Sequence, residues 1–164
     1  MRTLIFAAAF TCAAATAVAD PLDGKSYIIE LSSSQFSSGY GNDLVPPLVS
    51  VLADANLRSV TGPEADIVVN IVTDFDVGQW MGQGADRVWT YTVQITVGIS
   101  PGAYVIPDDG TPAFGVRARL LTPDRDREDE LACLIKLAAR TAIANYAPTG
   151  LFQTDGEACL RKHP

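Results

Sequence analysis

Histidine is nearly absent from this chain. The only histidine, His163, stands next to the C-terminal residue, where chains are commonly poorly ordered. Zinc sites, serine triads and haem attachment need histidine or several free cysteines, yet the chain has only 3 cysteines. These shortages argue against all three chemistries, and no motif indicates a metal site or another cofactor.

Basic residues are scarce as well. The chain has 12 Lys and Arg against 19 Asp and Glu, which gives a net charge of −7. Nucleic acids and anionic bilayers bind to cationic patches that displace counterions. The acidic balance therefore argues against a nucleic-acid partner and against a role on an anionic membrane surface.

Residues 1–19 have the order of a secretory signal peptide. Arg2 gives a positive start, "LIFAAAF" and the following alanines form an apolar region, and Ala17-Val18-Ala19 is an A-x-A site before Asp20. The apolar stretch is shorter than the roughly 20 residues of a membrane span. A lipid anchor at Cys12 is the less favoured alternative, because the preceding residue is not Gly, Ala or Ser. We expect cleavage, a periplasmic or secreted location, and no membrane insertion afterwards.

The expected mature chain, residues 20–164, carries a net charge of −8, because only one basic side chain is removed. Its length suits a single domain. It retains Cys133 and Cys159, which we predict to form a disulfide that tethers the C-terminal tail, because exported proteins meet an oxidising compartment. Such a bridge is worth roughly 3 to 4 kcal/mol in the chain-entropy model. The alternative is two unpaired thiols, one in the core and one in the tail.

Alternation of apolar and polar residues predicts most of the strands. Residues 67–77 and 88–99 alternate most clearly, residues 26–32 and 113–121 form two further strands, and residues 103–106 can add a short one. The alternation over residues 88–99 directs one set of side chains to a core and another to solvent, as in an antiparallel sheet with one wet face. The expected solvent-facing set is Thr90, Thr92, Gln94 and Thr96.

Apolar residues at helical spacing predict two helices. The first is expected after a cap at Asn42 or Asp43, and the second after a cap at Thr122 with Pro123 in its first position. Their buried positions are Leu44, Leu48, Val51, Leu52 and Ala55 in the first helix and Leu131, Leu134, Ile135, Ala138, Ala142 and Tyr146 in the second. The fold class we predict is a two-layer α+β sandwich, with a mainly antiparallel or mixed sheet of four to five strands and both helices on one face.

The run "GQWMGQG" places Trp80 and Met81 among glycines. It is not a phosphate-binding loop, because it lacks a following Lys-Ser/Thr and does not open a helix. We interpret it as a hairpin connection. Packing of the pair beneath the hairpin is the simpler interpretation. Projection into solvent is the alternative, and it would make the pair an anchor for a partner or an apolar ligand.

Two pairs of charged residues stand at strand spacing. Asp74 and Asp76 share one strand face, and Arg117 and Arg119 have the same spacing on another strand. Paired carboxylates can perform acid-base chemistry or bind Ca²⁺. We favour a cross-strand lattice of charges on a solvated face, which stabilises sheets of this kind.

The element order "KSYIIELSSS", helix, "ADIVVNIVTDF", a further strand and a closing helix resembles the small β-α-β-β-α domains of bacterial envelope proteins, such as the amino-terminal domain of TolB. The resemblance spans roughly residues 26–147 and includes no diagnostic motif, so it implies an envelope accessory role without assigning any residue a function.

Three hypotheses of function follow. The first is an exported, non-enzymatic domain that binds an envelope protein through an edge of the sheet or through the Trp80 hairpin. The second is a small-molecule or cation carrier that uses the polar sheet face, including Asp74, Asp76, Arg117 and Arg119. The third is a hydrolase that uses two carboxylates.

Overall fold

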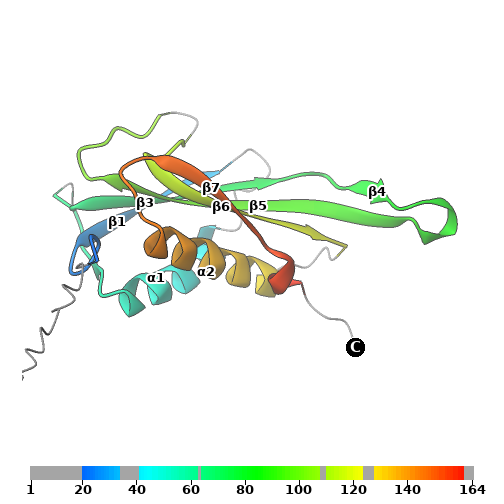
Figure 1. The fold of residues 1–164 in the computed structure, drawn as a ribbon, viewed down its shortest axis with the longest axis horizontal. Helices are drawn as coiled ribbons and strands as arrows, with labels where there is room; N and C mark the ends of the chain where they lie inside the picture. The colour runs from blue at the N-terminus through cyan, green and yellow to red at the C-terminus, as the bar shows by residue number, and fades with distance from the viewer. Residues whose placement is uncertain (1–19, 34–40, 63, 108–109, 124–127, 161–164) are drawn as a thin grey trace, which may run out of the picture.

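A computed structural model describes residues 20–33, 41–62, 64–107, 110–123 and 128–160 of the chain. Two α-helices and a mixed sheet form two layers (Figure 1). The helices are α1 (Gly41–Asp54) and α2 (Glu128–Ala144), and two short 3-10 helices are η1 (Gly84–Asp86) and η2 (Glu157–Cys159). The strands are β1 (Ser26–Ser33), β2 (Arg58–Ser59), β3 (Ile67–Phe75), β4 (Gln79–Met81), β5 (Val88–Pro101), β6 (Phe114–Thr122) and β7 (Gly150–Asp155).

The sheet has the strand order β2-β1-β3-β5-β6-β7, and β4 pairs with β5 beyond the end of β3. The pairs β2–β1, β1–β3 and β6–β7 are parallel, whereas β3–β5, β4–β5 and β5–β6 are antiparallel. The α+β class and the mixed sheet are therefore confirmed. The sheet has 7 strands rather than the four to five that we predicted.

Both helices cover the same face of the sheet, as predicted (Figure 1). Alternate residues of the strands point to this face because side chains alternate across a strand. Together with the buried stripes of the helices they form one hydrophobic core, whose largest fully buried side chains include Tyr27, Leu48, Leu52, Ile71, Ile95, Ile99, Phe114, Leu120, Leu131 and Leu134.

The opposite face is less solvated than the sequence suggested. The connection between β5 and β6 crosses it, and the Asn70 side chain donates a hydrogen bond of 2.8 Å to the carbonyl oxygen of Gly110 in this connection. Pro112 packs over Gly98 and Gly115, which are direct neighbours in the β5–β6 pairing and provide the space for its ring. Asn70 is consequently fully buried, and Thr96, which we had placed on a wet face, is only 5% exposed.

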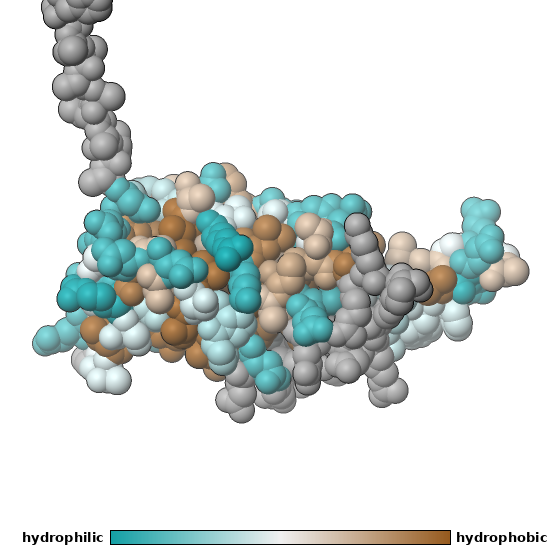
Figure 2. All heavy atoms as spheres, turned by 90° about the horizontal axis from the view of Figure 1, so that it is seen from below, coloured by the Kyte–Doolittle hydropathy of each residue, from teal (hydrophilic) through white to brown (hydrophobic). Residues whose placement is uncertain are grey.

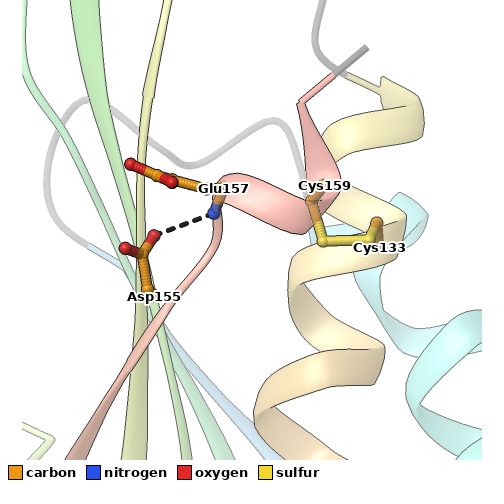
Figure 3. The surroundings of a disulfide bond; sticks show 4 residues. All are labelled: Cys133, Asp155, Glu157 and Cys159. Carbon is orange, nitrogen blue, oxygen red and sulfur yellow. Dashed lines mark hydrogen bonds between the residues drawn. A yellow bond between two sulfur atoms is a disulfide. The ribbon is translucent and has the colours of Figure 1, made fainter. Parts of the chain in front are cut away.

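The predicted disulfide between Cys133 and Cys159 is confirmed, and it joins α2 to η2 (Figure 3). Just before η2, the carboxylate of Asp155 accepts a hydrogen bond of 2.8 Å from the backbone N–H of Glu157. Gly156 lies so close to α2 that a Cβ there would overlap the Leu134 side chain. The tail is thus held against the body, and its first part is the edge strand β7, which we had not predicted.

Several element boundaries differ from our expectations. Residues 103–106 form no strand, the predicted strand 67–77 ends at Phe75 as β3, and the following connection contains the separate short strand β4. Asn42 and Asp43 lie inside the first turn of α1 rather than at its cap. Thr122 belongs to β6 instead of capping α2, and its hydroxyl bonds to a buried carboxylate oxygen of Glu130 at 3.1 Å.

Candidate interaction surface on a β-arm

The hairpin that contains both tryptophans extends beyond the rest of the sheet. β3 ends where Phe75 pairs with Val93, and β6 ends where Thr122 pairs with Tyr91. Among the described strands, β4 is therefore the one that pairs with residues 88–90 of β5. We call β4, residues 82–87 and residues 88–90 the aromatic arm. It projects from the body as a two-stranded ribbon (Figure 1).

Four large apolar side chains of the aromatic arm are exposed. Their exposed fractions are 56% for Trp80, 40% for Met81, 49% for Val88 and 37% for Trp89. Trp80 pairs with Trp89 and Met81 pairs with Val88, so the two pairs lie on opposite faces of the ribbon. Figure 2, which views the molecule from the helix side, shows the arm as a narrow extension on which hydrophobic and hydrophilic residues are mixed. Our simpler interpretation, in which Trp80 and Met81 pack beneath the hairpin, is therefore wrong.

The two indoles hold each other in place. The ring centroids of Trp80 and Trp89 lie 5.3 Å apart with an interplanar angle of 84°, which is the edge-to-face arrangement that aromatic pairs prefer. The guanidinium carbon of Arg87 lies 5.5 Å from the centroid of the Trp80 ring, within the range of a cation–π contact. The exposed Trp80 is thus oriented by two neighbours in the arm itself.

A β-bulge connects the aromatic arm to the body. Residues 76–78 face only residues 91–92, because Phe75 pairs with Val93 and Gln79 with Thr90. The Asp76 carboxylate accepts hydrogen bonds from the backbone N–H of Thr92 at 2.8 Å and of Gly78 at 3.0 Å. These bonds satisfy donors that the interrupted ladder would leave unpaired. In the structure, Asp76 therefore holds the base of the arm.

Gly78 is required at this bulge for two reasons. Its φ of +86° is a left-handed conformation, which glycine adopts without a steric penalty. A Cβ at this position would also overlap the indole nitrogen of Trp89 and lie 3.0 Å from the Tyr91 ring. The Trp89 indole thus packs directly over the Gly78 backbone, which links the bulge to the aromatic pair.

The structure does not bring the four predicted charged residues together. Asp74 pairs in register with Gln94, and Gln94 pairs with Arg119, so β5 separates the aspartates from the arginines. Arg117 Nε donates a hydrogen bond of 3.5 Å to the hydroxyl of Thr96. Among the described residues, no group of three or more His, Cys, Asp or Glu side chains could hold a metal ion.

The sequence identified Trp80 and Met81 but not their partners. Trp89 had been assigned to the core face together with the rest of its strand, and Val88 had received no role. The tryptophans on the two strands of one hairpin were the available signal, but the register of the hairpin was needed to use it.

Of the helices in the described ranges, none has the length and apolar character needed to cross a membrane.

No family model matches the chain, and no curated protein matches it. Solved structures that are similar include a minor lipoprotein from Acinetobacter baumannii, with a TM-score of 0.47 and 17% identity over 77% of this chain and 98% of that chain. A PelC dodecamer from Paraburkholderia phytofirmans has a TM-score of 0.43 and 11% identity over 71% of this chain and 84% of that chain. A variant PelC dodecamer from the same organism gives 0.42 and 12% over 71% and 83%. The resemblance to TolB stays a prediction.

Proposed function

We propose that this chain is an exported, non-enzymatic domain that binds a protein partner of the cell envelope through the aromatic arm. The observation that carries the proposal is the exposure of Trp80, Met81, Val88 and Trp89 on a ribbon that extends beyond the domain. Aromatic residues and methionine are enriched in the cores of protein interfaces, where a few such side chains supply most of the binding energy.

The geometry of the arm lowers the entropic cost of binding a partner through Trp80. Ordering one flexible side chain at an interface costs about 0.5–1.5 kcal/mol. Trp80 is already oriented by the Trp89 ring and by the Arg87 guanidinium, so a smaller share of this entropy is lost on binding. A partner with an apolar groove could receive the indole without rearranging it.

A protein is a better partner for the arm than a lipid bilayer. The connection at the tip contains Gln83, Asp86 and Arg87, all exposed, and these polar side chains would have to enter the bilayer before the tryptophans. The expected mature charge of −8 also disfavours anionic lipids and nucleic acids. A groove on a protein can accommodate both the apolar pairs and the polar tip.

Export is part of the proposal and rests on two features. Residues 1–19, which lie outside the described residues, carry the pattern of a signal peptide. The disulfide between Cys133 and Cys159 supports an oxidising compartment, because cytosolic thiols are kept reduced. Both features fit a periplasmic or secreted protein.

Site-specific photo-cross-linking in intact host cells tests the proposal. A photoreactive amino acid at Met81 is expected to yield a discrete adduct, whereas the same group at Val105, which is 85% exposed outside the arm, should not. Trp80→Ala should abolish the adduct and leave the body of the domain folded, since the contacts of the Trp80 ring with Trp89 and Arg87 lie within the arm. The identified partner should then bind the purified chain and not the Trp80→Ala variant. Equal adducts at both positions, or an adduct that survives Trp80→Ala, would refute this function.

The two other hypotheses have less support. A carrier or a hydrolase needs its charged groups to converge, but β5 lies between Asp74 and both arginines. The Asp76 carboxylate is engaged with backbone N–H groups. We therefore advance neither hypothesis as a second function.

A further inference from the structure

The sheet ends at β7, and one side of this strand carries backbone groups that β6 does not use. The N–H of Gly150 bonds to Ala113 O at 3.1 Å, and the N–H of Gly156 bonds to Arg119 O at 2.8 Å. Because backbone groups alternate in direction along a strand, the even-numbered residues of β7 face β6. The N–H and C=O groups of Leu151, Gln153 and Asp155 therefore point away from the sheet.

In the part of the chain that the structure describes, β7 lacks two common means of protecting an edge strand. Edge strands are commonly blocked by lysine, proline, a bulge or a covering segment. The sequence of β7, "GLFQTD", contains neither lysine nor proline, and its apolar side chains are open to solvent, with Leu151 51% and Phe152 48% exposed. Leu121 on β6 and Leu160 after η2 are also exposed, at 39% and 37%.

Two hollows flank the same edge. One, of about 280 Å³, is lined by Gly150 and Leu151 together with the buried Thr96 and with Arg117. The other, of about 350 Å³, lies towards the end of β7, where residues 153–155 line it with other neighbouring residues. The first hollow extends over the sheet face as far as Val72 on β3, and it reaches β7 at Gly150 and Leu151. The second hollow reaches β7 at residues 153–155, further along the same strand. An added strand carries side chains on one face at intervals of two residues, so two of them can reach the two hollows.

We propose that β7 receives an extended segment of a partner protein as an additional strand of the sheet. Backbone hydrogen bonds to Leu151, Gln153 and Asp155 provide affinity, and the two hollows select the side chains, which is the division of roles in strand addition. The guanidinium of Arg117 in the first hollow favours a segment with an acidic side chain or a terminal carboxylate at that end.

The occupant is a partner segment rather than a second copy of this chain. Each expected mature chain has a net charge of −8, and two such chains repel each other. This inference rests on the proposed partner-binding function, but it assigns a second surface and another binding mode. The aromatic arm and the β7 edge can therefore fail separately.

The alternation of β7 offers a matched pair of variants. In Gln153→Pro the chain loses an N–H that faces away from β6, so no hydrogen bond of the sheet is broken, and proline is tolerated at such edge positions. Gln153→Ala removes the same side chain but keeps the N–H. Urea unfolding of both variants checks that they remain folded.

Selection of a phage-displayed library of random twelve-residue peptides against the full mature chain, with the disulfide intact, tests the proposal. The expected peptides combine alternating apolar residues with an acidic group, and they slow amide exchange at Leu151, Gln153 and Asp155. Their affinity should fall about tenfold or more in Gln153→Pro, since a backbone hydrogen bond is lost and the ring obstructs pairing, and stay within about threefold in Gln153→Ala.

Four results would overturn the proposal. The first is a selection that enriches no peptide over an unrelated exported protein. The second is a set of peptides that bind Gln153→Pro as well as the wild type. The third is native mass spectrometry that shows a dimer abolished by Gln153→Pro, which would make a second copy the occupant. The fourth is a set of peptides whose binding requires Trp80, which would refute binding at the β7 edge and support the aromatic arm. Conversely, if the Met81 cross-link were absent while the peptides bound β7 as expected, the aromatic arm would be refuted and the β7 edge supported.

Discussion

Replacement of Gly78 by alanine should disorder the tryptophan pair, and Gly84 provides a control in the same arm. Both glycines have positive φ, +86° at Gly78 and +56° at Gly84. A Cβ at Gly84 would have no heavy atom within 4 Å, whereas one at Gly78 would overlap Trp89. The two substitutions therefore share the backbone strain and differ in whether the indole is displaced.

The difference between the variants can be estimated from these contacts. A left-handed backbone costs an alanine roughly 1–2 kcal/mol at either position. Only Gly78→Ala also disrupts the edge-to-face pair of Trp80 and Trp89, which is worth about 0.5–1.5 kcal/mol beyond its buried area. An extra loss of about 1 kcal/mol corresponds to roughly fivefold faster opening. Amide exchange in β4 should therefore be about fivefold faster in Gly78→Ala than in Gly84→Ala.

Two spectroscopic and binding measurements complete this comparison. Coupled indoles give an exciton couplet in circular dichroism, which should disappear in Gly78→Ala and persist in Gly84→Ala. Cross-linking from Met81 should weaken in the same order. If Gly78→Ala kept the couplet and the cross-link at the level of Gly84→Ala, the argument that Gly78 positions Trp89, and through it Trp80, would be wrong.

Two further predictions concern the body of the domain. Replacement of Cys133 and Cys159 by alanine should reduce the free energy of unfolding by about 3.5 kcal/mol, as urea denaturation can measure, because the disulfide has a sequence separation of 26; a loss below about 1 kcal/mol would contradict the loop-entropy argument. Hydrogen bonds from the Ser26 hydroxyl and backbone N–H hold the pKa of Asp66 below its ordinary value of 3.8. Because the folded pKa is lowered, this carboxylate stabilises the fold above the unfolded pKa, and the stabilisation is lost as the pH falls through the folded pKa. Ser26→Ala should raise the pKa of Asp66 in an NMR titration of its carboxyl group, and an unchanged pKa would show that Ser26 is not its main partner.

The sequence predicted the central part of the fold because there the pattern is dictated by burial. Residues 67–75 and 93–99 have two distinct faces, and the core face is covered by both helices. The solvated face could not be predicted as well, since its burial depends on the β5–β6 connection. The hydrogen bond between Asn70 and Gly110 joins residues 40 positions apart, so no local sequence pattern can indicate it.

The edge strands escaped prediction for a different physical reason. β2 has two residues and β7 is exposed along most of its length, so neither carries the apolar alternation that burial imposes on a central strand. β7 is defined by its pairing with β6 and by the tether from Cys159 to α2. Both constraints act between distant parts of the chain. The disulfide could be predicted from redox environment and cysteine count, but the strand that it accompanies could not.

In the candidate site, the sequence identified individual residues, but the strand register was needed to show how they act together. Trp80 and Asp76 were both selected from the sequence, one as an anchor and the other as a charged group. In the structure their roles are connected, because the Asp76 carboxylate holds the bulge over which Trp89 packs, and Trp89 orients Trp80. Exposure of the pair follows from where β3 and β6 end, which is a property of the whole sheet. A carboxylate that resembled a catalytic group thus helps to fix the direction of the arm.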